Sequence, residues 1–238
     1  MNVVLLRVGI DTGCGGISGP LFRDGSFEFI CIPDAHRADP RTYGNTLARC
    51  GRKIIDFFPP ARRVKMHDQS MHVDPEFQTY TYGDPTQGAK RGLRKLQLGD
   101  LLVFYAGLRG YDFECASALY IVGYFEVTLA GLASRFDPSL IDREFGANFH
   151  VRNQELFKLQ RESLLLVKGG SGSRLLKKAF PISQIGANRS GRPLQILSNE
   201  MRQVFGEFGG KHAIERSSPR WVEQTSVSTA ATFIRSLD

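Results

Sequence analysis

The stretch from Gly99 to Val127, GDLLVFYAGLRGYDFECASALYIVGYFEV, decides the expected fold. Two short runs within it, 101–105 and 119–127, are rich in branched and aromatic residues, as buried strands are. Gly99 and Asp100 are typical of a turn before the first run, and a polar loop joins the two runs. The simplest arrangement is an antiparallel pair at the centre of a sheet, with a loop that can reach a ligand.

Working outward, the 238 residues suffice for one domain with a sizeable core. No apolar run approaches the ~20 residues of a membrane helix, and Arg7 interrupts the apolar start, so neither a membrane span nor a secretory signal is expected. Four scattered cysteines without a CxxC pair predict reduced thiols in a cytoplasmic protein. We expect a single α+β domain over 1–238, with a lightly packed C-terminal tail from about residue 209.

The remaining pattern predicts short elements around the central pair. Strands are expected at 2–8 and 164–167, and a further strand at 27–32 after a hairpin turn at Asp24-Gly25. Apolar spacing predicts helices at 85–98, 137–144 and 193–205, and a short terminal helix at 229–237. The expected fold is therefore a mixed, largely antiparallel sheet, or a small barrel, flanked by short helices.

The charge pattern indicates a polyanionic partner. The net charge is +7, and a basic surface attracts nucleic acid, although it also serves solubility alone. In 37–65 cations alternate with aromatic residues, a mixture that suits base stacking and phosphate contact as well as it suits a solvated face. The helix predicted at 85–98 carries four cations and no acid, an arrangement that an anion would stabilise. We assign these cations to nucleic-acid backbone contact: Lys90, Arg91, Arg94 and Lys95.

A glycine-rich loop, 9–16, follows the first predicted strand. Its backbone N–H groups can cradle a phosphate, while Asp11 can orient a metal or a hydroxyl. The loop fits neither the Walker nor the dinucleotide pattern, and a tight turn whose glycines adopt positive φ explains it equally well. The candidate phosphate ligands are Thr12, Gly13, Gly15, Gly16 and Ser18.

A second loop of this kind follows the strand predicted at 164–167. Glycines allow close approach of a ligand, serines donate hydrogen bonds and flanking cations neutralise phosphate; a plain flexible hairpin is the alternative. Its candidate ligands are Lys168, Gly169, Gly170, Ser171, Ser173 and Arg174. Lys177 and Lys178, behind them, are further candidates for nucleic-acid backbone contact. We predict that the two glycine loops converge on one positively charged pocket sized for a nucleotide.

A histidine and an aspartate two residues apart, His72 and Asp74, are the candidate acid–base pair, with Asp11 as a third catalytic candidate. Histidine titrates near neutral pH, and a carboxylate can orient it. A histidine that only hydrogen-bonds a loop is the more common case. His67 and His72 are five residues apart, which does not fit a helical zinc pair, and no metal site is expected.

Four motifs occur in order along the chain and carry a family resemblance: RVGIDTGCGGISGPLFRDGSFEFICIPD (7–34), MHVDPEF (71–77), the central stretch with its GD and GYFEV ends, and LVKGGSGSRLLKKAFPIS (166–183). Together they resemble the third family of nucleotide-modification-associated domains. The resemblance implies an association with DNA base modification systems in bacteria, archaea and phages. The loop after Asp74, at 80–84, departs from the family pattern.

The positions that the resemblance carries over are Asp11, Gly15, Gly16, Ser18, His72, Asp74, Lys168, Gly169, Ser173 and Arg174. The central strands are also similar to the sheet core of PUA, ASCH and EVE domains, small barrels that read modified or flipped bases. Such recognition uses an aromatic wall. The candidates for base stacking are Tyr82, Tyr105 and Tyr111.

Three functions fit these observations. The first is a module that binds a modified base or nucleotide, in DNA rather than RNA. The second is an enzyme of nucleotide or DNA base modification that uses Asp11, His72 or Asp74 for acid–base or metal chemistry. The third is a basic subunit that meets an acidic protein. The sequence identifies neither a cofactor nor an oligomeric state.

Overall fold

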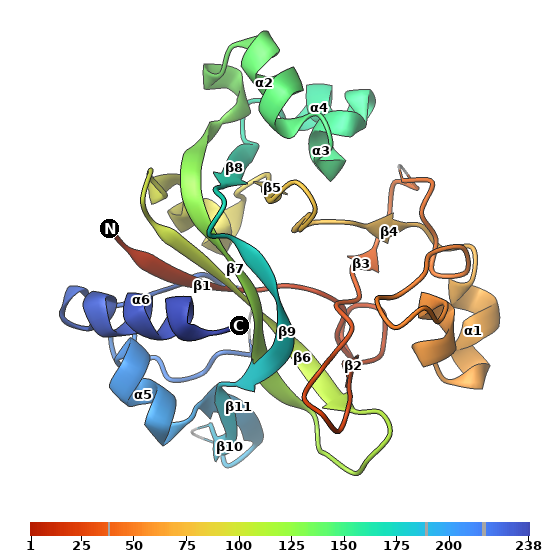
Figure 1. Ribbon diagram of the computed structural model, residues 1–238, viewed down its shortest axis with the longest axis vertical. Helices are drawn as coiled ribbons and strands as arrows, with labels where there is room; N and C mark the ends of the chain where they lie inside the picture. The colour runs from red at the N-terminus through yellow and green to blue at the C-terminus, as the bar shows by residue number, and fades with distance from the viewer. Residues whose placement is uncertain (38, 189, 216–217) are drawn as a thin grey trace.

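The computed structural model describes residues 1–37, 39–188, 190–215 and 218–238, and Figure 1 shows how their elements surround one large sheet. Eight described strands belong to this sheet. They are β1 (Val3–Arg7), β2 (Gly19–Leu21), β5 (Thr81–Asp84), β6 (Leu101–Gly110), β7 (Ala118–Leu132), β8 (Leu165–Gly169), β9 (Arg174–Pro181) and β12 (Arg220–Trp221).

The predicted central pair is confirmed, since β6 and β7 are antiparallel neighbours in the middle of the sheet. The main path runs β12-β1-β6-β7-β8-β5, while β2 pairs with β6 and β9 with β7. Most pairings are antiparallel, but β1 and β2 run parallel to β6. Because the path has two ends, no closed barrel forms in the described part of the chain, and the fold is a mixed α+β sheet with short helices.

Burial explains why β6 and β7 form the centre. Both strands read as continuous apolar runs because both faces of the sheet are covered there. Phe104 and Phe125 cross edge to face with ring centroids 4.8 Å apart, and Phe77 packs on both at 5.6 and 5.5 Å. Such aromatic pairs add about 0.5–1.5 kcal/mol each to the burial term.

Short helices and two small sheets complete the fold. The two-stranded sheets pair β3 (Ile32–Pro33) with β4 (Met71–His72), and β10 (Ser183–Ala187) with β11 (Pro193–Leu197). The described helices are η1 (Ile54–Phe57), α1 (Pro60–Met66), η2 (Gly88–Lys95), η3 (Ala133–Arg135), α2 (Pro138–Phe145), α3 (Phe149–Arg152), α4 (Gln154–Gln160), α5 (Asn199–Phe205), η4 (Gln224–Ser226) and α6 (Val227–Ser236). None of them is long and apolar enough to span a bilayer.

Three secondary-structure predictions need correction. The helix predicted at 193–205 is β11 followed by α5, because Ser198 accepts the N–H of Met201 and starts a new helix. The strand predicted at 27–32 is mostly irregular, with its backbone bonded to separate partners such as Ile10 and Pro20. The helix predicted at 85–98 is the shorter 3₁₀ helix η2.

The C-terminal segment differs from the lightly packed tail that its composition predicts. Ile214 is completely buried, and β12 adds an edge strand beside β1. Helix α6 places Val227, Ala230, Ala231 and Ile234 in the main core. These positions have the i, i+3, i+4, i+7 spacing of an amphipathic helix.

Two smaller lobes extend from the sheet in Figure 1: the irregular segment around β3, β4 and α1, and the α2–α4 cap at the top. The first has its own core, which includes Tyr43, Phe58 and Met71. The second packs Ile141 and Phe145 against Leu164 and Leu166 at the end of the sheet. A cavity is lined by residues of both lobes and of the sheet.

Candidate functional site

A cavity of about 620 Å³ is lined by six separate parts of the chain. Its volume falls within the 300–1,000 Å³ typical of small-molecule sites. The parts are the end of β1 with the loop after it, residues 32–36, the β4 region, β5 with the start of η2, α3–α4, and Glu215 near the C-terminal end.

Three titratable side chains, His72, Asp74 and His150, meet on the cavity wall. One ligand atom of each lies within 4.8 Å of the other two. The side chains of Asp74 and His150 are 1% and 4% exposed. The His72 ring packs against the tilted Phe149 ring, with centroids 3.9 Å apart, and edge-on against the His150 ring at 4.9 Å. The predicted pair His72–Asp74 therefore stands in one site, together with a histidine from a distant helix.

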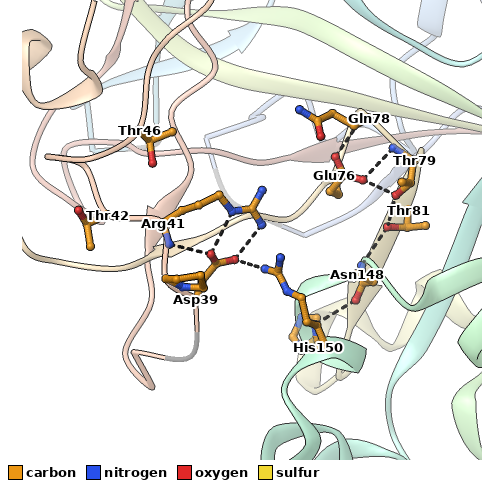
Figure 2. A network of polar contacts seen from close by, with 12 residues as sticks. Asp39, Arg41, Thr42, Thr46, Glu76, Gln78, Thr79, Thr81, Asn148 and His150 are labelled. Atoms are coloured by element: carbon orange, nitrogen blue, oxygen red, sulfur yellow. Dashed lines mark hydrogen bonds and ion pairs between the residues drawn. The ribbon is translucent and has the colours of Figure 1, made fainter.

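His150 is positioned by the start of α3. Asn148 accepts the N–H of His150 at 3.0 Å and so caps this helix. The Asn148 amide also points to Thr81 Oγ1 of β5 at 3.4 Å, and Figure 2 shows this chain continuing to the Glu76 loop. The short helix is thereby attached to the edge of the sheet.

A second anchor holds the other end of α3. Arg152 donates to the buried carboxylate of Asp39. The same carboxylate accepts a two-pronged contact from Arg41 (Figure 2). The Arg41 fork reaches Asp39 at 3.0 and 2.8 Å. Such charge-assisted, bidentate contacts are among the stronger hydrogen bonds in proteins. The two anchors place His150 opposite His72 and Asp74.

The hydrogen bonds of His150 define which ring nitrogen faces the cavity. Its Nδ1 lies 2.7 Å from Gln160 Oε1, which can only accept, so Nδ1 carries the hydrogen. Nε2 then presents a lone pair toward Asp74 Oδ2 at 3.4 Å, too long for a good hydrogen bond. Gly83 N–H donates to the same Oδ2 at 2.8 Å. Asp74 Oδ1 and His150 Nε2 have no hydrogen-bond partner among the described residues, although both are buried.

Burial shifts two of these groups in opposite directions. Desolvation raises the pKa of Asp74 to about 6, and the adjacent His150 ring and the Gly83 N–H only partly offset it. Desolvation and the neighbouring His150 lower the pKa of His72 to about 3. His72 is therefore uncharged at neutral pH, while Asp74 is an unusually basic carboxylate. Perturbed groups of this kind concentrate at functional sites.

The first glycine loop contributes only part of itself to the cavity, with Gly9, Asp11 and Cys14 in the lining. The Asp11 carboxylate accepts the N–H groups of Gly13 and Cys14 at 2.8 and 2.7 Å, and its backbone oxygen accepts that of Gly16. These donors are therefore directed inward, as in a tight turn, and the phosphate cradle is not preformed. Thr12, Gly13, Gly15, Gly16 and Ser18 are outside the lining.

The second glycine loop lies elsewhere, so the predicted convergence of the two loops is wrong. In the second loop, the Gly170 N–H donates to Glu126 O on β7, and Glu126 pairs with Leu101 at the start of β6. The first loop follows Arg7, which pairs with Tyr105, four residues further along β6. Four residues of strand, about 13 Å, and two strand spacings therefore separate them. Sequence reasoning placed both loops after strands but had no information about which ends of the sheet those strands reach.

The side chains of this second loop have local structural partners. The Ser173 hydroxyl accepts the N–H of Glu126 at 3.0 Å, and Lys168 Nζ donates to Glu144 O at 3.3 Å. The Arg174 guanidinium lies 5.6 Å from the Tyr124 ring centroid. Within residues 168–174, Ser171 is exposed and Gly169 is buried. The residues 168–174 therefore contribute nothing to the cavity lining.

The cavity is also not positively charged as predicted. Its described lining holds five carboxylates, Asp11, Asp34, Asp74, Asp84 and Glu215. Against these stand two permanent cations, Arg7 and Lys90, each in an ion pair, with Asp11 at 3.0 Å and with Asp84 at 2.7 Å. The inner wall thus favours cations or uncharged polar groups over phosphate.

Two of the three predicted stacking tyrosines are in the core. Tyr105 is fully buried and donates to Ile214 O at 2.8 Å, so no base can stack on it. Tyr82 lines the cavity but is 3% exposed, with its hydroxyl 3.0 Å from Asp84 Oδ2. Tyr111 is exposed but lies in a separate cluster with Phe22 and Phe57, beneath the Arg52 guanidinium.

The predicted backbone contacts divide between two regions. Lys90 lines the cavity, and Arg91, Arg94 and Lys95 are exposed on the same helix, η2. Lys177 and Lys178 are exposed on β9, where Lys177 borders a second, more open cavity of about 720 Å³. Only the η2 group adjoins the His72–Asp74–His150 cluster.

Sequence reasoning missed His150, its partner Gln160 and the Gly83 amide. His150 belongs to the run Asn148-Phe149-His150, in which a helix-capping asparagine precedes an aromatic residue. That cap was a detectable signal of a helix start, but nothing in the spacing connects this helix with β4. A side chain on Gly83 would lie 2.7 Å from His150 Cδ2, which explains why a glycine stands there.

The profile of the family described as nucleotide modification associated domain 3 matches residues 2–234, nearly the whole chain. The resemblance inferred from the four motifs is confirmed by this match. Comparisons with curated proteins and with solved structures give no match.

Proposed function

This chain belongs to the nucleotide modification associated domain 3 family, and we propose that it is an enzyme that modifies a nucleotide or a DNA base. The family associates it with nucleotide or DNA modification. His72, Asp74 and His150, on the wall of the cavity, are the candidate active site for such chemistry. The base or nucleoside would enter the cavity, while phosphates would remain outside, near the basic helix η2.

One observation carries the proposal: two buried polar atoms of residues that line the cavity, Asp74 Oδ1 and His150 Nε2, have no hydrogen-bond partner among the described residues. An unmade hydrogen bond at a buried group costs about 1–3 kcal/mol, so a purely structural site would satisfy these atoms. Groups kept unsatisfied beside an accessible cavity are suited to bind a reacting molecule.

The acidic lining supports a base or sugar, and not a phosphate, as the group that enters. Carboxylates and imidazoles can hydrogen-bond the polar edge of a base, whereas five acids would repel a phosphate. A base inside duplex DNA must leave the stack to reach such a site, at a cost of a few kcal/mol. Single-stranded DNA or a free nucleotide avoids that cost.

Mass spectrometry of nucleosides tests the proposal. DNA and nucleotide pools from cells that produce the wild-type protein are compared with those from cells producing Asp74→Asn. The matched control is Asp68→Asn, since Asp68 is 95% exposed and outside the cavity. We expect a changed nucleoside with the wild type and with the control only. Identical nucleoside profiles for wild type and Asp74→Asn would contradict the proposal. If the protein retains DNA although the nucleoside profile is unchanged, it reads a base and does not modify it.

A further inference from the structure

We propose that His72, Asp74 and His150 form a binding site for one divalent transition-metal ion, with open positions directed into the cavity. The donor set is two imidazoles and one carboxylate. This set suits first-row ions such as Fe²⁺, Co²⁺ and Zn²⁺ better than Mg²⁺ or Ca²⁺, which prefer oxygen ligands. The inference rests on the proposed function only in taking the same cavity as the working site, because metal binding itself needs no nucleotide.

Two acceptor atoms, His150 Nε2 and Asp74 Oδ2, are in contact. The Nδ1–H of His150 is engaged by Gln160, so its Nε2 presents a lone pair to the Asp74 carboxylate at 3.4 Å. Two lone pairs facing each other in a buried site repel unless a cation lies between them. Two ligands each about 2.1 Å from a tetrahedral metal are themselves about 3.4 Å apart. The observed separation is therefore that of two metal ligands.

His72 supplies the third ligand. A nitrogen of His72 lies within 4.8 Å of the other two ligand atoms, so closure around an ion requires a contraction of at most about 1.4 Å. His72 is the least buried member of the cluster, which leaves its ring room for this adjustment. The three ligands come from the β4 region and from α3, so the ion would join the two lobes.

The hydrogen-bond partners of these ligands also fit a metal site. Metal-bound histidines usually donate their second ring N–H to an oxygen acceptor, and ligating carboxylates are themselves hydrogen-bonded. His150 has such an acceptor in Gln160, and Asp74 accepts the Gly83 N–H. Four further carboxylates line the cavity against the two cations Arg7 and Lys90, and this excess of negative charge attracts a cation. Each feature is built into the fold and independent of the others.

Metal binding to the full-length, chelator-treated protein tests the assignment. Co²⁺ serves as the probe because its visible d–d absorption reports coordination, and Zn²⁺ is titrated separately by calorimetry. We expect one equivalent of either ion to bind. His72→Ala and Asp74→Asn each remove a ligand and should weaken binding by more than about 100-fold, whereas Gln160→Ala removes only the supporting acceptor and should cost about 10–100-fold. His67→Ala is the matched control, because His67 is exposed and outside the cluster, and it should bind as the wild type does.

X-ray absorption of the Co²⁺ or Zn²⁺ form identifies the ligands directly. Only nitrogen and oxygen scatterers are expected; a sulfur ligand would assign the metal to Cys14, which also lines the cavity, and would overturn the inference. Absence of stoichiometric binding, or unchanged affinity in His72→Ala and Asp74→Asn, would overturn it as well. Metal binding without DNA or nucleotide modification would refute only the proposed function, and modification without stoichiometric metal binding would refute only the metal site.

Discussion

Asp39 and Arg152, far apart in the sequence, form an ion pair that ties the β3–β4 lobe to the helix carrying His150. Arg41 also contacts this carboxylate, and the two arginines share its Oδ2. Together with the contact from Asn148 to Thr81, this pair determines where His150 stands relative to His72 and Asp74. The candidate centre therefore depends on polar contacts at a distance from it.

Replacement of Asp39 by Ala should lower the free energy of unfolding by about 2–3 kcal/mol. Loss of one partner from a fully buried pair costs about 3–5 kcal/mol, but the two arginines are 33% and 38% exposed and regain hydration. Urea denaturation at pH 7 measures the change. Asp68→Asn, at a 95% exposed position, should stay within about 0.5 kcal/mol of wild type. Equal stability of the two variants would show that Asp39 does not hold the lobes together.

The same carboxylate predicts a loss of stability in acid. Burial by itself would raise the pKa of Asp39, but hydrogen bonds and charge from Arg41 and Arg152 outweigh it and hold this pKa below its ordinary value of 3.8. The unfolded chain therefore takes up the proton first as the pH falls. The stabilisation is complete above pH 3.8 and disappears as the pH decreases through the lower folded value. Urea midpoints measured from pH 6 to pH 2 should fall more steeply for wild type than for Asp39→Asn; parallel curves would contradict this.

A bound metal should raise the melting temperature. With free Zn²⁺ at about 100 times its Kd, stabilisation is about 2.7 kcal/mol, or about 5–10 °C for a chain of this size. Differential scanning calorimetry should show this increase for wild type and for His67→Ala, but not for His72→Ala. An equal increase in all three proteins would indicate binding away from the cluster.

Binding to single-stranded DNA should weaken steeply with salt, because cations that contact phosphate release counterions. If η2 guides the backbone to the cavity, Arg91→Gln with Lys95→Gln should reduce the slope of log K against log salt by about 1.4, at about 0.7 per lost contact. Lys177→Gln with Lys178→Gln removes the same charge from β9 and should change the slope less. Fluorescence anisotropy of a labelled oligonucleotide measures both. A larger effect at β9 would place the nucleic acid on the other side of the sheet.

The sequence predicts the fold in outline because its strongest signals are local. The apolar runs around Phe104 and Phe125 can only be buried, and Asp137 before Pro138 is a helix cap recognisable without a structure. Helix α6 was also predicted to within two residues at its start. Where local and tertiary preferences compete, prediction failed: Pro193–Leu197 has helical spacing but pairs with β10.

The candidate site was only half predictable. His72 and Asp74 are near in sequence, so their cooperation could be inferred, but His150 joins them through α3 and its anchors on Asp39 and Thr81. The glycine loops had matching composition, yet the ends of the sheet at which they lie depend on strand order. Tyr105 shows the same limit, since an aromatic residue in a strand looks identical whether it faces a ligand or the core.

A crystal structure of the protein with a short single-stranded oligonucleotide tests the central claim most directly. The account predicts one base inside the cavity, with its edge within hydrogen-bond distance of His72, Asp74, His150 or an ion held by them, and with its phosphates outside, beside η2. A base or backbone bound instead at the 168–174 turn or in the second cavity, with no nucleotide beside the three residues, would contradict it.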